Sequence, residues 1–302
     1  MKIAIIGTNG MLSKALTQLF HAQGDVVVVY GLEPPTDYLC SQYLPCNLLV
    51  DRLDYESFRQ YGMVIYAAGA GVQAALSTPS EWMYALNVTS PIAITIGLKN
   101  AGFNGVFVSF GSYMEIGINQ KLNHAYTESE IVCSSMPVSN DYALSKRLFT
   151  RYMNDINVSY LHWHFILPNM FSKNDMLPGT RLIPYVIQCA KEMNEGNEVQ
   201  PSFSSGRQIR QFIQLEELIN VINLSYEKHL DSGIYCVGGG EIYSIRDLIE
   251  RIFNFYGIKC SDSWFGTEIR RDNDIRYLAQ KGKKLYDHIG YLPKSKIENL
   301  LM

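Results

Sequence analysis

Five short apolar runs alternate with helix-like segments over the first half of the chain. The runs span Lys2–Gly7, Val26–Tyr30, Met63–Ala68, Gly105–Phe110 and His162–Leu167. Helical spacing of apolar residues marks Met11–Gln23, about Glu81–Asn100 with a kink near Pro91, and Asp141–Asn154. Strands that are apolar on both faces are typical of parallel sheets covered by helices on both sides. We therefore predict an α/β fold built on a doubly wound parallel sheet.

The pattern changes after Pro168, where loops rich in Asn, Ser and Gly separate three further helical segments. We expect these helices at about Thr180–Asn194, Leu215–Tyr226 and Ile245–Tyr256. Residues 1–168 should form the larger domain, with part of 210–237 returning to it. Residues 169–302 should form mainly a smaller C-terminal α/β lobe that binds a substrate.

Composition excludes several classes of function. The 302 residues are 47% apolar and 18% charged, which indicates a folded chain. A net charge of −3 without a basic stripe argues against a nucleic-acid partner. The six Cys show neither C-x-x-C nor metal-ligand spacing, so we expect no metal and reduced thiols in the cytoplasm. The N-terminal apolar run is too short for a signal peptide or a membrane span, so we expect no membrane partner.

The first strand ends in a glycine loop, Gly7-Thr-Asn-Gly10-Met-Leu-Ser13, which opens the first helix. In this position a tight glycine turn lets backbone N–H groups at the helix N-terminus approach a pyrophosphate. Ser13 is small enough for close packing of the helix on the strand. An ordinary turn with two glycines is the alternative. The loop predicts that residues 1–168 are a Rossmann-type NAD(P)-binding domain.

The end of the second strand bears on the choice of cofactor. An acidic residue there would bind the ribose hydroxyls of NAD and repel the 2′-phosphate of NADP. The strand ends Tyr30-Gly31-Leu32-Glu33, and the acidic position falls on Gly31. No Arg follows to bind a 2′-phosphate, and Glu33 could still reach a ribose. We favour NADP (NADPH) over NAD.

Tyr142-Ala-Leu-Ser-Lys146 places a phenol and an ammonium one helical turn apart on the same face. The ammonium can lower the pKa of the phenol, which makes the pair an acid–base device for a carbonyl or alcohol oxygen. Chance supplies about one such pair in a chain of this composition, and Tyr277–Lys281 is a second. Only Tyr142 lies after a glycine loop, four strand signals and the strand-end Ser112 and also before a candidate phosphate-binding Arg. The second pair has no glycine loop or strand end to serve it, so we interpret it as incidental.

With these features the chain resembles the extended short-chain dehydrogenase/reductase family, of the NAD-dependent epimerase/dehydratase type. Within it, the chain looks most like the nucleotide-sugar 4-ketoreductases of deoxysugar biosynthesis. Further segments carry the resemblance in order: Asn47-Leu48, Ala67-Ala68-Gly69, Asn87-Val88, Val108–Ser112, Leu167–Phe171, Arg210–Ile213 and Tyr235–Gly238. Asn47-Leu48 is similar to the adenine-contacting Asp-Leu that follows the family's second helix, with Asn in place of Asp.

The resemblance implies roles for individual residues. Ser112, Tyr142 and Lys146 would be catalytic; Ser112 is placed by counting back from Gly117, and Ser109 competes with it. The implied cofactor contacts are Gly7, Asn9, Gly10, Met11, Leu12, Asn47, Leu48, Ala67, Ala68, Gly69, Asn87, Tyr142, Lys146 and Pro168. The implied substrate contacts are Ser112, Tyr113, Asn169 and Arg210, with the Arg210 guanidinium on a diphosphate.

The residues after Ser112 distinguish members of the family. Dehydratases of this type carry an Asp-Glu pair there, whereas this chain has Tyr113-Met114, and Glu115 stands alone. The resemblance therefore implies NADPH-dependent reduction of a dTDP- or CDP-linked 4-keto-6-deoxyhexose, for surface polysaccharides such as the O-antigen of lipopolysaccharide. It also implies a homodimer. The alternatives are an NAD-retaining nucleotide-sugar epimerase and a non-catalytic NAD(P)-binding regulatory relative.

Overall fold

The computed structural model describes residues 1–71, 78–172, 181–267 and 275–301. At its centre is a parallel sheet of seven strands in the order β3-β2-β1-β4-β5-β6-β9. The strands are β1 (Lys2–Ile6), β2 (Val26–Gly31), β3 (Gln42–Pro45), β4 (Met63–Tyr66), β5 (Val106–Ser112), β6 (Leu161–Leu167) and β9 (Gly233–Cys236). The strand order reverses between β1 and β4, where doubly wound sheets bind dinucleotides. The predicted Rossmann-type fold is confirmed.

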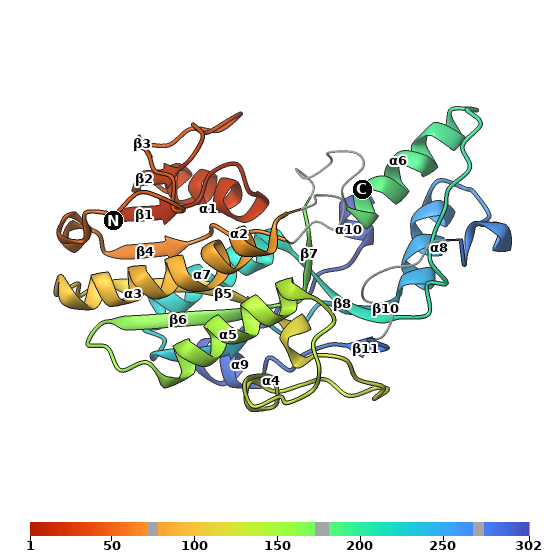
Figure 1. The fold of residues 1–302 in the computed structure, drawn as a ribbon. Helices are drawn as coiled ribbons and strands as arrows, with labels where there is room; N and C mark the ends of the chain where they lie inside the picture. Colours follow the sequence, from red (N-terminus) through yellow and green to blue (C-terminus); the bar gives the residue numbers. More distant parts are fainter. Residues whose placement is uncertain (72–77, 173–180, 268–274, 302) are drawn as a thin grey trace.

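Helices cover both faces of this sheet (Figure 1). One layer consists of α1 (Met11–Ala22), α7 (Leu215–Glu227) and α9 (Lys283–Ile289), and the other contains α3 (Ser90–Asn100) and α5 (Asp141–Asp155). Successive residues of β1 point into opposite cores, with Ile3 and Ile5 on the α1 side and Ala4 and Ile6 on the α3 side. This two-sided burial explains why the strand reads as a continuous apolar run.

The long helix expected at Glu81–Asn100 is interrupted. It consists of α2 (Ser80–Tyr84), a π-helical turn at Ala85–Thr89 and α3, which has Pro91 in its first turn. The irregular turn therefore lies before the proline, at the position where the proline ring would clash with a regular helix. It also holds Asn87, which is 1% exposed.

Two strands of the large sheet were not predicted from the sequence. β3 follows β2 through residues 32–41, which contain no helix although β2 and β3 are parallel. β9 pairs with β6 and lies far along the chain, after α7. Both strands have only four residues and lie at the two ends of the sheet.

A second, smaller sheet lies beside the large one (Figure 1). It contains β7 (Asn169–Phe171), β8 (Ile209–Gln214), β10 (Glu241–Ser244) and β11 (Tyr277–Leu278). Its apolar core includes residues of α6 (Leu182–Asn194) and α8 (Ile245–Phe255). Ser244 caps α8 by accepting a hydrogen bond from Asp247 N–H at 3.0 Å. A short helix, α10 (Glu298–Leu301), packs on α8.

Side chains satisfy backbone groups of the terminal strand β9. The Cys236 N–H donates to the carboxylate of Glu128 at 2.9 Å, from α4 (Glu128–Val132). The Lys284 ammonium, from α9, donates to the Ile234 carbonyl at 2.8 Å. One acceptor and one donor thus cover the strand on the side away from β6.

Two isoleucines on α3 test the assignment of its buried face. Ile94 is 1% exposed in the core beneath the sheet, whereas Ile96 is 46% exposed. We expect Ile94→Ala to lower the free energy of unfolding by about 2–5 kcal/mol, because it leaves a cavity. Ile96→Ala should change it by no more than about 0.5 kcal/mol. Urea denaturation followed by circular dichroism measures both, and equal effects would contradict the packing.

Candidate active site

The glycine loop between β1 and α1 fits closely against the turn after β4. Gly7 has φ +122°, and a Cβ there would lie 2.7 Å from the Ala68 nitrogen. Gly10 caps α1 and leaves the first N–H groups of the helix facing the carboxyl edge of the sheet. Met11 and Leu12 begin the helix half-buried against the core. This cradle of small residues at a helix N-terminus fits a dinucleotide pyrophosphate.

The side chain of Asn9, a predicted cofactor contact, is bonded to the loop after β2. Its backbone is left-handed, with φ 54°. Its side-chain amide donates to the Pro34 carbonyl at 3.0 Å and accepts from Thr36 N–H at 2.9 Å. The side chain therefore ties the loop after β2 to the glycine loop, which leaves the Asn9 backbone to face a phosphate.

At the end of β2, Gly31 stands where an acidic residue would bind the ribose of NAD. The space beside Gly31 is filled by Thr8 of the glycine loop. A Cβ on Gly31 would lie 2.5 Å from the Thr8 hydroxyl oxygen. Thr8 thus fills the space where an Asp or Glu side chain would begin. Glu33 is exposed two residues further on.

Asn47 and Leu48 follow strand β3, and residues 32–41 before that strand contain no helix. The carboxamide oxygen of Asn47 accepts from Leu49 N–H at 3.0 Å, and the backbone N–H of Asn47 donates to the Asp51 carboxylate at 2.7 Å. The pair forms a compact turn at the edge of the sheet, and contact with an adenine stays a prediction.

Asn87 clamps the turn after β4 to helix α5. Its amide accepts from Ala70 N–H at 3.0 Å and donates both to the Ala70 carbonyl at 2.9 Å and to the Ser145 hydroxyl at 3.0 Å. A Cβ on Gly69 would lie 3.1 Å from the Asn87 oxygen and 4.0 Å from Lys146 Nζ. Asn87 therefore holds Ala67-Ala68-Gly69 beside Lys146.

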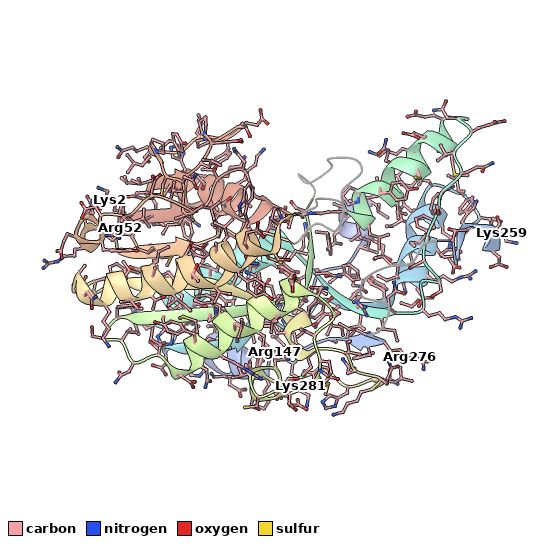
Figure 2. The ribbon with its side chains drawn as sticks, in the orientation of Figure 1. Lys2, Arg52, Arg147, Lys259, Arg276 and Lys281 are labelled. Carbon is pink, nitrogen blue, oxygen red and sulfur yellow. The ribbon has the colours of Figure 1, made fainter. Side chains whose placement is uncertain are left out.

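Tyr142 and Lys146 lie one turn apart on α5, as the spacing predicts. Tyr142 is 9% exposed. The Lys146 ammonium donates to the Phe110 carbonyl on β5 at 3.0 Å. Desolvation lowers the pKa of Lys146 to about 8, against the opposing charge of Glu115. The second pair is different, because Tyr277 lies on strand β11 and Lys281 (labelled in Figure 2) follows it outside any helix.

Ser112 ends β5 and caps the 3₁₀ turn Tyr113–Ile116. Its hydroxyl oxygen accepts from Met114 N–H at 3.3 Å, so its own hydrogen can be donated elsewhere. Ser109, the competing serine, is fully buried and shares a 2.8 Å hydrogen bond with His164 Nδ1. The environments of the two hydroxyls support Ser112 as the residue that faces a substrate.

The predicted substrate contacts fall in two places. Tyr113 is 2% exposed in an apolar cluster with Ile116 and Tyr126, and this packing argues against a substrate contact. Pro168 joins β6 to β7, which Asn169 begins opposite Phe212 of β8. Arg210 is buried on β8 and donates to the Ile209 carbonyl at 2.8 Å.

Two residues near the site were missed. Arg181 precedes α6, and its guanidinium contacts the Met11 sulfur at the start of α1. It lies outside any local motif, so only the fold brings it there. Glu115 is 0% exposed and accepts from Ser112 N–H at 2.6 Å. Burial raises the pKa of its carboxyl to about 7. In the sequence, Glu115 stood alone, outside the position of the Asp-Glu pair of the dehydratases, and had no assigned role.

Two other classes of site are not found. The described ranges contain no group of three or more His, Cys, Asp or Glu residues placed to hold a metal ion. Within the same ranges, no helix has the length and apolar character needed to cross a membrane.

Comparison with known families identifies the family to which the chain belongs. A family model described as NAD dependent epimerase/dehydratase family matches residues 3–238. The chain belongs to this family. The match includes the glycine loop, Ser112 and the Tyr142–Lys146 pair, and it confirms the resemblance inferred from the sequence. A comparison with curated proteins gave no match.

Several solved structures share the fold over the whole chain at low sequence identity. The dTDP-glucose 4,6-dehydratase DesIV of Streptomyces venezuelae, with NAD bound, has TM-score 0.77 at 16% identity. The UDP-glucose 4-epimerase of Thermotoga maritima, with UDP-glucose, has TM-score 0.78 at 18% identity. MoeE5, in complex with UDP-glucuronic acid and NAD, has TM-score 0.77 at 15% identity. Each comparison covers 100% of this chain and, respectively, 94%, 96% and 97% of the other.

Gly7 tests the dinucleotide cradle. We expect Gly7→Ala to weaken NAD(P) binding roughly tenfold or more, because the new methyl meets the Ala68 backbone and moves the loop. Gly24→Ala is the control: Gly24 has φ +85° but no atom within 4 Å of a Cβ. It should cost only about 1–2 kcal/mol of stability through the backbone. Isothermal titration calorimetry distinguishes the two, and normal binding by Gly7→Ala would exclude this cradle.

Proposed function

We propose that the protein reduces a dTDP- or CDP-linked 4-keto-6-deoxyhexose to the corresponding deoxyhexose, using NADPH, for surface polysaccharide synthesis. The observation that carries this proposal is the convergence of Tyr142, Lys146 and Ser112 at the carboxyl edge of a sheet with a dinucleotide cradle. The nucleotide-sugar ligands named for structures of the same fold, UDP-glucose and UDP-glucuronic acid, support the substrate class.

The side chains fit the proton chemistry of ketone reduction. A bound nicotinamide supplies the hydride that goes to the carbonyl carbon. As negative charge develops on the carbonyl oxygen, Tyr142 donates its phenolic proton there, and Ser112 donates a hydrogen bond to the same oxygen. Lys146, held by the Phe110 carbonyl, lowers the pKa of the phenol through its charge. The product is an alcohol, and Tyr142 regains its proton from solvent.

The dehydratase reaction fits less well. Positions 113 and 114 carry Tyr and Met, so neither supplies a carboxylate. The carboxylate of Glu115 bonds to the Ser112 backbone inside the protein. An acid and a base that could remove water from a hexose are therefore missing from the turn after Ser112.

Two basic residues suit a sugar nucleotide. Arg181 precedes α6 and contacts Met11 at the start of α1, and Arg210 lies on β8, the strand that pairs with β7. A guanidinium pairs with two phosphate oxygens at once, so this pair suits the diphosphate of the substrate.

The Thr8–Gly31 contact supports NADPH as the cofactor. The side chain of Thr8 occupies the place of the carboxylate that would bind a free 2′-hydroxyl. An epimerase that retains NAD is the second candidate, favoured by the family match and by NAD in solved structures of the fold. Tightly bound NAD in the purified protein would identify it, whereas consumption of added NADPH identifies the reductase.

The two Tyr-x-x-x-Lys pairs provide a matched test of the catalytic assignment. We expect Tyr142→Phe to lower the rate of NADPH oxidation by about 100-fold to 10 000-fold, because the proton donor is lost. The control Tyr277→Phe should retain full activity, since Tyr277 lies on β11 of the other sheet. The assay uses a panel of CDP-, dTDP- and GDP-4-keto-6-deoxysugars with NADPH or NADH. Turnover of none of them, or an active Tyr142→Phe, would refute the proposal.

The cofactor preference is tested by exchanging Thr8 and Gly31 together. Gly31→Asp alone should fail to bind either cofactor well, because its Cβ meets Thr8. The double variant Thr8→Gly/Gly31→Asp has room for the carboxylate, which should bind the ribose of NADH and repel NADPH. We expect the ratio of the two dissociation constants to change at least tenfold, about 1.4 kcal/mol. Thr8→Gly is the control, and an unchanged ratio in the double variant would contradict this account.

A further inference from the structure

A buried polar cluster lies behind the catalytic residues, between β5, β6 and α5. His164 shares hydrogen bonds of 2.8 Å with the hydroxyls of Ser109 and Thr150. The Glu115 carboxylate lies next to it and accepts from Ser112 N–H at 2.6 Å. All of these side chains are less than 1% exposed. The proposed reaction uses none of their titratable groups directly.

Gly111 makes the space for this cluster. A Cβ there would lie 2.7 Å from the Glu115 carboxylate, 2.7 Å from His164 Nε2 and 3.0 Å from the Thr150 hydroxyl. Three polar side chains from three different elements thus converge on one missing side chain. Such convergence indicates a specific polar arrangement, because a buried polar group lowers the stability of the fold unless its hydrogen-bond partners are in place.

Charged and titratable groups on α5, β6 and β9 surround Glu115. Helix α4 also packs on its turn and carries Glu128, bonded to Cys236 N–H, and Glu130, bonded to His124. Helix α5 supplies Lys146 and Arg147, and Arg147 (labelled in Figure 2) donates to the Glu115 backbone carbonyl at 2.6 Å. Strand β6 supplies His164, whose pKa burial lowers to about 3, so its ring is neutral. Strand β9 supplies Cys236, whose thiol pKa burial raises well above its usual value. Lys146 donates to the carbonyl of Phe110, and the Glu115 carboxylate packs against the next residue, Gly111, so this carboxylate lies near the ammonium.

We propose that Glu115 is a positioning residue, whose carboxylate is the buried counter-ion that keeps Lys146 protonated and whose bond to Ser112 N–H holds the reacting hydroxyl in place. Both roles serve the proposed reductase, so the proposal rests on that function. Desolvation lowers the pKa of Lys146, and the charge of Glu115 opposes that effect. Without this charge, Lys146 would lose its proton, and Tyr142 its electrostatic partner, at a lower pH.

Glu115→Gln separates the charge from the hydrogen bond. The amide oxygen can still accept from Ser112 N–H, but the negative charge is gone. We expect the pKa of Lys146 to fall by about one unit or more. Glu115→Asp keeps the charge and should restore most of the shift. The control is Glu130→Gln: Glu130 occupies the same third position in the capping box of α4 and has Thr127 and His124 as partners.

The first measurement needs no substrate. Trace labelling with acetic anhydride across pH, read by mass spectrometry of the Lys146 peptide, gives the pKa of Lys146, with the exposed Lys259 as reference. An unchanged Lys146 pKa in folded Glu115→Gln overturns the proposal, whether or not any sugar is reduced. If Glu115→Gln does not fold, Lys146→Met serves in its place. The pKa of Glu115, followed by carboxyl carbon NMR, should then rise, and no rise would overturn the proposal.

The second measurement is the pH profile of NADPH oxidation. In Glu115→Gln the alkaline limb of kcat should move to lower pH by the same amount, while KM stays within about twofold. A shift in labelling without turnover by any variant would leave the counter-ion role standing and refute the reductase. If Glu115→Gln lowered kcat equally at every pH and left the alkaline limb of the pH profile unchanged, Glu115 would have a structural role only, and the proposal would be overturned.

Discussion

The parallel register of the central strands is the constraint on which the site depends. Strands β1, β4, β5 and β6 are paired in parallel, so their carboxyl ends meet at one edge. The glycine loop, the turn after β4, Ser112 and Pro168 all follow those ends directly. Because side chains alternate along a strand, a slip of one residue would turn Ser112 to the other face. The buried apolar residues on both faces prevent such a slip, so the core of the sheet also fixes the chemistry.

Four glycines around the candidate site allow close contacts that residues with a side chain would prevent. At Gly7 the space for a Cβ is taken by the Ala68 backbone, at Gly31 by Thr8, at Gly69 by Asn87 and at Gly111 by Glu115. At Gly7, Gly31 and Gly111 the neighbours lie closer than a Cβ would permit, and at Gly69 the contact is tight. Three of these contacts surround the cofactor cradle, and the fourth lies behind Ser112. The same steric rule therefore organises cofactor binding and the electrostatics of catalysis.

The sequence predicted the elements whose signal is local. The runs at β1, β2, β4, β5 and β6 are apolar on both faces, and the Tyr142–Lys146 spacing defines a helix face without tertiary information. The strand β3 could not be recognised, because Gln42–Pro45 is short, is exposed at both ends and is a strand only through pairing with β2. Glu115 looked misplaced for the same reason: its partners on α5 and β6 lie more than thirty residues away in sequence.

The covered end of the large sheet has a consequence for association between molecules. An open strand edge recruits strands from other chains, which is a common route to aggregates. Glu128 and Lys284 occupy the hydrogen-bonding groups of β9 that a foreign strand would need. At the opposite end, β3 has only four residues, and so short an edge strand gives a foreign strand few groups to pair with. One end of the sheet is thus partly covered by side chains and the other is short, and both features discourage the addition of a foreign strand.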